Sequence, residues 1–372
     1  MFCPETEQIF YLIVLSGRVL FAEIGERVAV VLSTQAEVRV PSFGAAPAPR
    51  FALGYALVLM LFATSPLWLG AVGLYQYLAL EVLIWSLYAL GYNLLLGYGG
   101  LPSFGHGAFF GVGAYATGLA LKHADVGLIG GMAAAIFGAA LFGALVAAFI
   151  SHRRGIYYAL MTIAFGQLAW FVSIKWHSVT GGEDGLLNIP RPPLDLGFVQ
   201  LSLTSHAALF YFALVLFAVI AWGLWYLIDT PFGRVLGAVK QNEMRAAYCG
   251  HNVWLVKFTV FLMSCAIAGL AGGLFALAQQ SAYPNVMSLN NSGYVVMMVL
   301  IGGGLVSFWG PVIGAVFFIV ARDLLGAYTE TWLLWYGLLF MAVVLFKPEG
   351  IAGMIEQLRA QLRSRPARGR GA

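Results

Sequence analysis

The sequence has few charged residues: Asp, Glu, Lys and Arg together make up 10% of its 372 residues. Soluble globular domains carry about 25% charged residues, so this composition excludes an ordinary soluble domain. Disordered chains combine few apolar residues with a high net charge. They are excluded as well, because 61% of this chain is hydrophobic and its formal net charge is +4. The composition predicts a membrane protein.

Cysteines and the residue patterns of common catalytic sites are also scarce. The three cysteines, Cys3, Cys249 and Cys265, lack the spacing of a metal site and imply no disulfide framework. The chain has no G-x-x-x-x-G-K-S/T loop for nucleotide phosphates, no H-E-x-x-H and no G-x-S-x-G. We therefore expect no catalytic residues, no metal site and no cofactor bound by this chain. An integral-membrane enzyme is disfavoured.

Long apolar runs predict the fold class. The runs 207–228 and 258–279 have the length of an α-helix that crosses a hydrocarbon core about 30 Å thick. The 45 glycines fit such a protein, because small residues let transmembrane helices approach closely. We predict an all-α, polytopic α-helical membrane protein with about ten (8–10) transmembrane or re-entrant helices. The predicted spans are 51–69, 77–97, 105–121, 126–150, 155–175, 207–228, 258–279, 293–304, 309–325 and 331–346.

A glycine break interrupts the predicted spans near the C-terminus. The segments 293–304 and 309–325 lie on either side of Gly302-Gly303-Gly304. They form either two short helices or one re-entrant pair, because irregular backbone at membrane depth survives only where protein covers it or where it lines a cavity.

Basic residues predict the orientation, because cytoplasmic loops of membrane proteins are enriched in Lys and Arg. We place the polar loop 229–257 in the cytoplasm and let the spans alternate. All but four of the 20 Lys and Arg residues then lie on the cytoplasmic side. Both termini are therefore predicted to be cytoplasmic. The four on the other side are Lys122, Lys175, Arg191 and Arg322.

Three regions follow from these patterns. Residues 1–50 are a poorly defined N-terminal extension, whose short apolar run is interrupted by Arg18. It fits a signal-like segment, a surface helix or an over-long start, and we favour a cytoplasmic extension without a role in transport. The transmembrane domain is 51–354 and includes the cytoplasmic loop 229–257. Residues 355–372 are a basic cytoplasmic tail near anionic lipid, which implies no binding of nucleic acid.

The loop 229–257 contains the most informative pattern. Helix formers run over 235–248, and Gly250 fits the residue that follows a helix C-terminus. Ala246 and Ala247 give this helix a small surface surrounded by charge, suited to docking in a groove of a cytoplasmic partner. An ordinary amphipathic connector would show the same pattern.

The spacing Glu243-x-x-Ala246-Ala247-x-x-Gly250 resembles the E-A-A…G coupling motif of ABC importer permeases. Other segments are similar, in the same order along the chain, to the LivM-type permease subunit of branched-chain amino acid ABC importers. The resemblance covers about residues 75–354, with departures at Leu101-Pro102 and Val306-Ser307. The matching segments are Gly97 to Tyr115, Thr180-Gly181-Gly182-x-Asp184-Gly185-Leu186, Ala268 to Gly272, Gly310-Pro311 with Gly314-Ala315, and Pro348-x-Gly350.

The resemblance implies a permease subunit of the bacterial inner membrane with the ABC-importer permease fold. It would form half of a pathway for branched-chain or other hydrophobic amino acids. The implied partners are a second homologous permease, two cytoplasmic ATPase subunits that use ATP and Mg, a periplasmic solute-binding protein and membrane lipid. The implied ATPase-coupling residues are Glu243, Arg245, Ala246, Ala247 and Gly250.

Two alternatives to this function stay open on the sequence alone. The same architecture could import urea or short amides, since related permeases carry such cargo. A self-sufficient secondary transporter or channel is the second alternative, and it would have more paired ionisable residues within the membrane than Glu81 offers.

Polar residues on the predicted spans are candidates for the translocation pathway. Ser103, Gly105 and His106 lie at a glycine-rich helix start, which fits either a broken helix lining the pathway or close helix packing. Glu81 is a carboxylate inside a span, so it lines the pathway or reaches water at the outer end. The remaining candidates are Asn93, Thr162 and Gln167, for which hydrogen bonds between helices are the favoured role.

Two further patterns concern the loops. Thr180, Gly181, Gly182 and Asp184 belong to a glycine-rich turn in the outer loop, which either contacts the binding protein and shapes the pore mouth or is a plain surface turn. The segments GGLPSF (99–104) and GGLVSF (303–308) resemble each other, as a remnant of duplication or by chance. Both are predicted to lie near the inner side.

Overall fold

The structure is a computed structural model. The chain divides into two units, and the description concerns the second, Val40–Ala372. The predicted N-terminal extension and basic tail fall almost wholly outside the described residues. The described residues are 49–69, 76–124, 126–195, 200–203, 205–305, 307–329, 331–346, 350–355 and 358.

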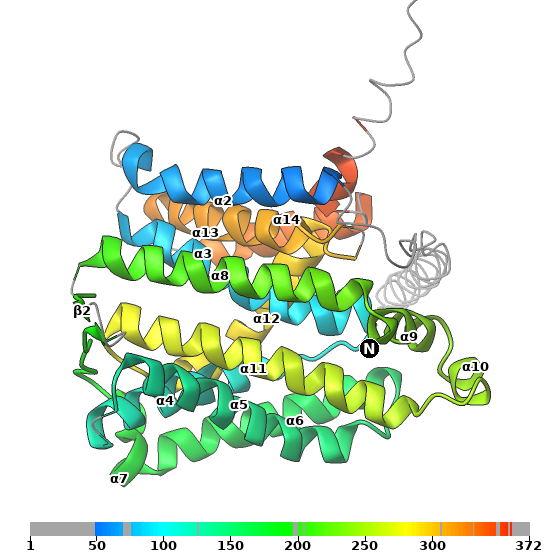
Figure 1. Cartoon of the computed structure of the whole chain (residues 1–372), viewed down its shortest axis with the longest axis horizontal. Helices are drawn as coiled ribbons and strands as arrows, with labels where there is room; N and C mark the ends of the chain where they lie inside the picture. The colour runs from blue at the N-terminus through cyan, green and yellow to red at the C-terminus, as the bar shows by residue number, and fades with distance from the viewer. Residues whose placement is uncertain are drawn as a thin grey trace, which may run out of the picture. The chain divides into compact units, whose positions relative to one another are not determined.

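Each of the ten predicted spans contains a helix (Figure 1). Among the described residues, six helices are long and apolar enough to cross a membrane, and α2, α12 and α14 contain shorter apolar segments. The prediction of a polytopic all-α membrane protein is confirmed. The ten helices are α2 (Pro49–Leu69), α3 (Gln76–Asn93), α4 (Gly107–His123), α5 (Leu128–Ile150), α6 (Gly155–Lys175), α8 (His206–Asp229), α11 (Val253–Gln279), α12 (Leu289–Gly302), α13 (Gly310–Tyr328) and α14 (Trp332–Phe346).

Short elements occupy the two ends of the helices. Figure 1 shows α7 and β2 at one end and α9 and α10 at the other. The predicted outer and inner loops therefore lie at opposite ends of the helices. The short elements are the π-helix η1 (Leu94–Tyr98), α7 (His177–Thr180), η2 (Gly182–Asp184), the antiparallel pair β1 (Leu194–Asp195) and β2 (Gln200–Leu201), α9 (Pro231–Gln241), α10 (Glu243–Tyr248) and η3 (Pro284–Met287).

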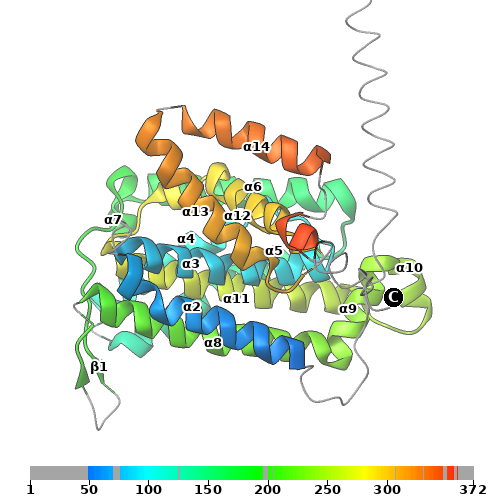
Figure 2. The same ribbon diagram turned by 90° about the horizontal axis from the view of Figure 1, so that it is seen from above.

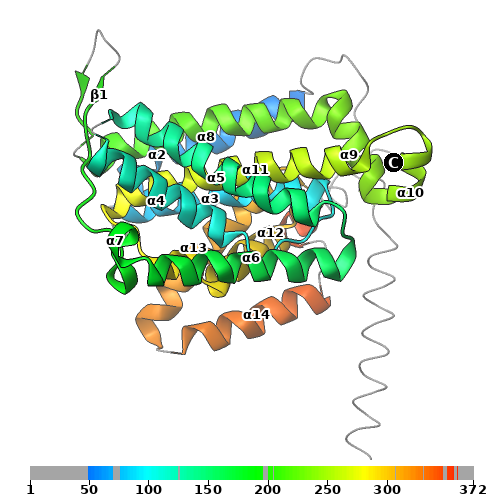
Figure 3. The ribbon, with the colours of Figure 1, turned by 90° about the horizontal axis from the view of Figure 1, so that it is seen from below.

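The helices α3 and α11 form the core of this unit. Figures 2 and 3 show them between α8 at one edge and α14 at the other. The helix α11 packs against α3, α4 and α5, and α3 also packs against α8, α12 and α13. The span at α3 is buried throughout and α11 is largely buried, whereas most residues of α5, α6, α8 and α13 are only partly buried or exposed. These exposed faces fit contact with lipid or with another apolar chain.

Close packing in the core depends on glycine. At Gly272 in α11, an added Cβ atom would overlap the carbonyl oxygen of Phe110 in α4. At Gly113 in α4, it would overlap the backbone of Gly269 in α11. The backbones of α4 and α11 therefore touch, which is how glycine stabilises helix pairs in a membrane.

Replacing Gly272 with valine is expected to lower the free energy of unfolding by about 1–3 kcal/mol, the usual effect of overpacking. Gly223→Val is the matched control, because an added Cβ atom at this exposed position in α8 meets no atom within 4 Å. Thermal unfolding of both variants in detergent measures the effect. Equal midpoints for the two variants would contradict the packing described here.

The glycine break at 302–304 separates two helices of unequal length. The helix α12 has 14 residues and α13 has 19. Between them Gly303 adopts φ +82°, a left-handed conformation that glycine reaches without strain. The break therefore joins a short helix to one of membrane length.

Candidate functional site

The inner loop folds into two helices, whereas the sequence predicts one helix over 235–248. The helix α9 ends at Gln241 and α10 begins at Glu243, and Asn242 between them has extended backbone. The Oδ1 atom of Asn242 accepts a hydrogen bond from the backbone N–H of Arg245 at 3.0 Å. Asparagine competes with helical hydrogen bonds through such local contacts, which explains why the run of helix formers breaks here.

The C-terminus of α10 has the glycine that the sequence predicts. Gly250 adopts φ +87°, and its N–H donates to the carbonyl oxygen of Ala247 at 3.0 Å. The N–H of His251 donates to the carbonyl oxygen of Ala246 at 3.2 Å. These two bonds make a Schellman motif, in which glycine ends the helix without strain.

Glu243 fixes α10 to two other parts of the chain. Its Oε1 atom lies 3.0 Å from Nζ of Lys257 in α11, and its Oε2 atom lies 2.6 Å from Nε of Arg154. The Lys257 side chain is only 1% exposed, and its Nζ also donates to the carbonyl oxygen of Arg153 at 2.6 Å. Because a buried ammonium group must be paired, Glu243 anchors α10 to α11 and to the α5–α6 loop.

The sequence analysis missed the partners of Glu243. The α5–α6 loop lies about ninety residues before α10, and no local pattern links the two. Lys257 is 14 residues from Glu243 and belongs to the next helix. No sequence signal identified the pair, because the burial of Lys257, which calls for a paired carboxylate, is seen only in the structure.

One side of α10 is exposed. Met244 and Tyr248 expose 47% and 82% of their surface, and Ala247 and Arg245 are exposed as well. Met244, Ala247 and Tyr248 are spaced at i, i+3 and i+4, so they share one side of the helix. We call these three residues the α10 face. Ala246 is buried, so the small docking surface predicted from both alanines contains only Ala247.

Lys240 connects α9 to the end of α3. Its Nζ atom donates to the carbonyl oxygen of Gly97 in the π-helix η1 at 2.7 Å. Its side chain passes close to Gly100, where an added Cβ atom would lie 2.8 Å from Cγ of Lys240. Burial lowers the pKa of Lys240. A lysine at the carbonyl groups of a helix C-terminus is stabilising, so this contact links the inner loop to a core helix.

Replacing Lys240 with methionine is expected to raise amide hydrogen exchange around Gly97 to Leu101 about tenfold. The physical reason is the loss of a hydrogen bond to a charged group, which contributes about 1.5–3 kcal/mol. Hydrogen-exchange mass spectrometry on the full chain in detergent measures the rates. Gln241→Met, at the exposed neighbouring position, is the control, and equal exchange in the two variants would contradict the proposed link.

Asn93 lies where two helix breaks meet. Its side chain is 1% exposed, and an added Cβ atom at Gly97 or at Gly304 would contact its Oδ1 atom. An added Cβ atom at Gly97 would also lie 2.9 Å from the carbonyl oxygen of Gly304. The chain breaks that begin the GGLPSF and GGLVSF segments are therefore neighbours in space.

His106 is enclosed by aromatic rings and is fully buried. Its ring lies 5.9 Å from that of Tyr88 and 5.1 Å from that of Tyr92. Its Nε2 atom lies 3.1 Å from Oγ of Ser264, which donates to the carbonyl oxygen of Gly91 at 2.7 Å. Because that hydroxyl proton is used, Nε2 is the donor to Ser264. Of the two predicted roles, this geometry supports close helix packing, with His106 hydrogen-bonded to Ser264.

The other residues of this helix start contact α3 and α6. The N–H of Ser103 donates to the hydroxyl of Tyr92 at 3.2 Å, and that of Phe104 donates to Oγ1 of Thr162 at 3.2 Å. An added Cβ atom at Gly105 would overlap the carbonyl oxygen of Thr162. Gly105 and Thr162 are therefore in contact and Ser103 lies against Tyr92 of α3, whereas Gln167 lies half-buried further along α6.

Glu81 is paired with an arginine that the sequence analysis had not linked to it. Both of its carboxylate oxygens lie 2.9 Å from the guanidinium of Arg322, which comes from α13, 241 residues away. The residue Glu81 is 8% exposed. Two parallel contacts between a carboxylate and a guanidinium form a strong, directional pair. This fork ties α3 to α13.

The glycine-rich turn of the predicted outer loop is held by a hydrogen bond to nearby backbone. The Oγ1 atom of Thr180 donates to the carbonyl oxygen of Ser173 at 2.6 Å. Gly181 and Gly182 adopt φ +79° and +68°, which side chains disfavour. Asp184 is exposed. These contacts explain the two glycines as turn residues and leave Asp184 on the surface.

The outer loop is docked on the C-terminal end of α11. Leu186 pairs with Ala282 through backbone hydrogen bonds of 2.7 and 2.9 Å. Arg191 donates from Nε to the carbonyl oxygen of Leu277 and from Nη2 to that of Ala278, both at 2.7 Å. Basic side chains satisfy the free carbonyl groups at helix ends. Arg191 is therefore a structural residue of this loop.

The chain is similar to permeases of known transport systems. Residues 74–347 match the family model described as "branched-chain amino acid transport system / permease component". The LivM permease protein of the high-affinity branched-chain amino acid transport system of Salmonella typhimurium is 27% identical over 313 residues, covering 79% of this chain and 73% of that protein. Its Escherichia coli counterpart is 27% identical over 298 residues, covering 74% and 69%.

A relative with another cargo in its name is also similar. The nucleoside ABC transporter permease protein NupC of Lactococcus lactis is 24% identical over 234 residues, covering 58% of this chain and 69% of that protein. No solved structure matches the chain significantly. Among the described residues, no three His, Cys, Asp or Glu side chains are grouped to hold a metal ion.

Proposed function

Because the chain belongs to the family of permease components of branched-chain amino acid transport systems, we propose that it forms half of the translocation pathway of an ATP-driven importer. The chain is a transport permease subunit and a multi-pass membrane protein. The proposed cargo is branched-chain or other hydrophobic amino acids. The observation that carries the proposal is the α10 face, an exposed helix side at the inner end whose helix is anchored to the core.

The anchoring of α10 would let it transmit force to the core helices. Glu243 joins α10 to α11 through Lys257 and to the α5–α6 loop through Arg154. Lys240 joins α9 to the end of α3. Because α3 and α11 form the core, a force applied to α10 reaches the helices that would line a pathway. Coupling also requires that the ATPase contact α10 differently in its two nucleotide states.

The proposed assembly contains the partners implied above. A second homologous permease would complete the pathway, and a periplasmic solute-binding protein would deliver cargo. Two cytoplasmic ATPase subunits that use ATP and Mg would bind below the permeases, and the α10 face would be this chain's contact with them. This chain would bind no cofactor and catalyse no reaction. Its surroundings would be the lipid of the bacterial inner membrane.

The orientation follows from charge. Arg153, Arg154, Lys240 and Lys257 all lie at the end of the helices that bears α10, as their contacts require. Cytoplasmic loops are enriched in such residues. We therefore propose that this end is cytoplasmic and that both termini lie on the same side.

Uptake into proteoliposomes tests the function. They would contain this chain, its neighbouring permease, the ATPases and the binding protein, with ATP on the ATPase side. Labelled leucine is the first cargo, and urea, a short amide and a nucleoside are measured in parallel. Leucine uptake that requires ATP and the binding protein is expected. Uptake of another cargo would correct the substrate, and ion-driven uptake by this chain alone would overturn the proposal.

A further inference from the structure

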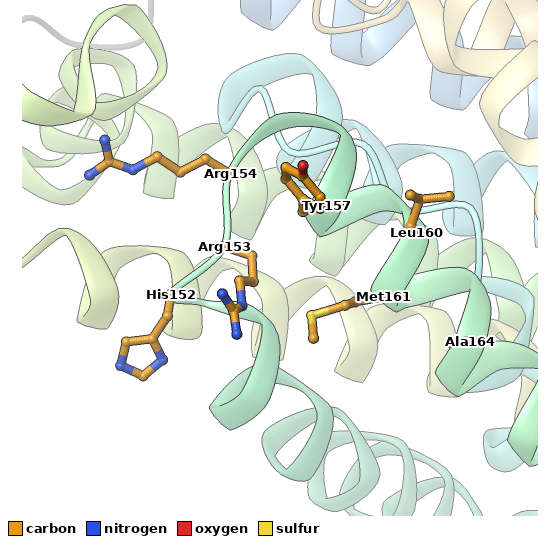
Figure 4. A pocket seen from close by; sticks show the side chains of 7 residues that line it. All are labelled: His152, Arg153, Arg154, Tyr157, Leu160, Met161 and Ala164. Atoms are coloured by element: carbon orange, nitrogen blue, oxygen red, sulfur yellow. The ribbon is translucent and has the colours of Figure 1, made fainter.

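A pocket of about 500 Å³ is lined by the α5–α6 loop and by the first turns of α6 (Figure 4). One part of it is basic and the other is apolar. In Figure 4 the side chains of Arg153 and Met161 point toward each other from these two parts. We call it the α5–α6 pocket. Its lining residues are His152, Arg153, Arg154, Tyr157, Leu160, Met161 and Ala164.

The basic part of the α5–α6 pocket has unused capacity for an anion. Arg153 is exposed, and no carboxylate pairs with its guanidinium among the described residues. Arg154 contacts Glu243 through Nε of its guanidinium, and the Arg154 side chain is 55% exposed. The helix α6 begins here without a side-chain cap, so the positive end of its dipole adds to the field of the two arginines.

The basic part is also held in place. The Nζ atom of Lys257 donates to the carbonyl oxygen of Arg153, and the N–H of Arg153 donates to the carbonyl oxygen of Ile150 at 2.8 Å. The N–H of Ser151 donates to the carbonyl oxygen of Ala147 at 3.0 Å. A loop backbone fixed in this way needs no further ordering on binding, so that only the arginine side chains lose freedom.

The apolar part runs along α6. Tyr157 and Leu160 expose 70% and 54% of their surface, and Ala164 is exposed too. The helix α6 has the length and apolarity of a membrane span, so its first turns lie near the boundary between hydrocarbon and headgroups. The pocket thus places positive charge at headgroup depth and apolar side chains along the hydrocarbon.

We propose that the α5–α6 pocket binds an anionic phospholipid. Its phosphate contacts the guanidinium groups of Arg153 and Arg154, and its acyl chains lie along Tyr157, Leu160 and Ala164. The charge of the pocket selects the phosphate headgroup, because basic clusters at a membrane surface attract anionic lipids. The apolar wall distinguishes a phospholipid from a free phosphate ion.

Native mass spectrometry of the full chain tests the proposal. The protein is purified with any membrane partners that accompany it and is exchanged into phosphatidylglycerol or phosphatidylcholine. Preferential retention of phosphatidylglycerol is expected, and Arg153→Gln is expected to reduce it about tenfold, as for loss of a charged hydrogen bond. Lys175→Gln, at the exposed other end of α6, is the matched control and leaves retention unchanged.

A second variant tests the apolar part. Ala164→Trp fills the wall without changing charge, and it is expected to reduce phosphatidylglycerol retention several-fold. Binding of inorganic phosphate is measured in parallel, because this ion has the charge of the headgroup without the acyl chains. Equal retention in the unmodified chain and Arg153→Gln, or a loss of the same size in Lys175→Gln, would overturn the proposal. The proposal would also be overturned if phosphate binding depended on Arg153 while Ala164→Trp left lipid retention unchanged. Retention needs no transport, so the outcome is independent of the proposed function.

Discussion

Ala247→Arg is expected to reduce ATP-driven uptake roughly a hundredfold, the size of effect seen when a central contact of an interface is lost. Ala247 belongs to the α10 face, one turn from Met244 and next to Tyr248, and it is exposed. An arginine there adds bulk and charge where a partner would have to approach closely. Uptake by proteoliposomes that contain the complete transporter measures the effect.

The position of Ala247 makes this test specific. Because its side chain points away from the core, the variant should insert and unfold as the unmodified chain does, which thermal unfolding in detergent checks. Ala247→Ser keeps the small size and should transport normally. A well-inserted Ala247→Arg protein with normal uptake would remove α10 from the proposed coupling mechanism.

Arg322→Met is expected to lower the free energy of unfolding by about 3 kcal/mol, because it leaves a buried carboxylate without its partner. Glu81 is 8% exposed, and both of its oxygens lie 2.9 Å from the Arg322 guanidinium. Thermal unfolding in detergent measures the loss. Lys175→Met is the control, since it removes an exposed positive charge at the same end of the helices.

The double variant Glu81→Leu with Arg322→Met separates structure from transport. Replacing both members of a buried ion pair with apolar residues is often neutral, so stability should largely return. If the pair only ties α3 to α13, uptake returns with stability. If Glu81 serves the pathway, a stable double variant stays inactive. An Arg322→Met protein as stable as Lys175→Met would contradict the buried ion pair itself.

The sequence by itself determined the elements that depend on neighbouring residues. Apolar runs of membrane length predicted a helix at each of the ten spans, because burying backbone polar groups in lipid requires helices. Gly250 was correctly placed after a helix C-terminus, because a left-handed residue there needs no long-range information. The resemblance of the motifs agrees with the family match over residues 74–347.

Only the tertiary structure decided the pairings between distant segments. It joins Glu243 to Lys257 and Arg154, and Glu81 to Arg322. Charge counts along a chain do not reveal such pairs, because each depends on how two helices are rotated and packed. Packing also decides that Ala246 is buried while Ala247 is exposed, although the two are adjacent alanines. Which residue faces a partner is set by the contacts of the whole helix.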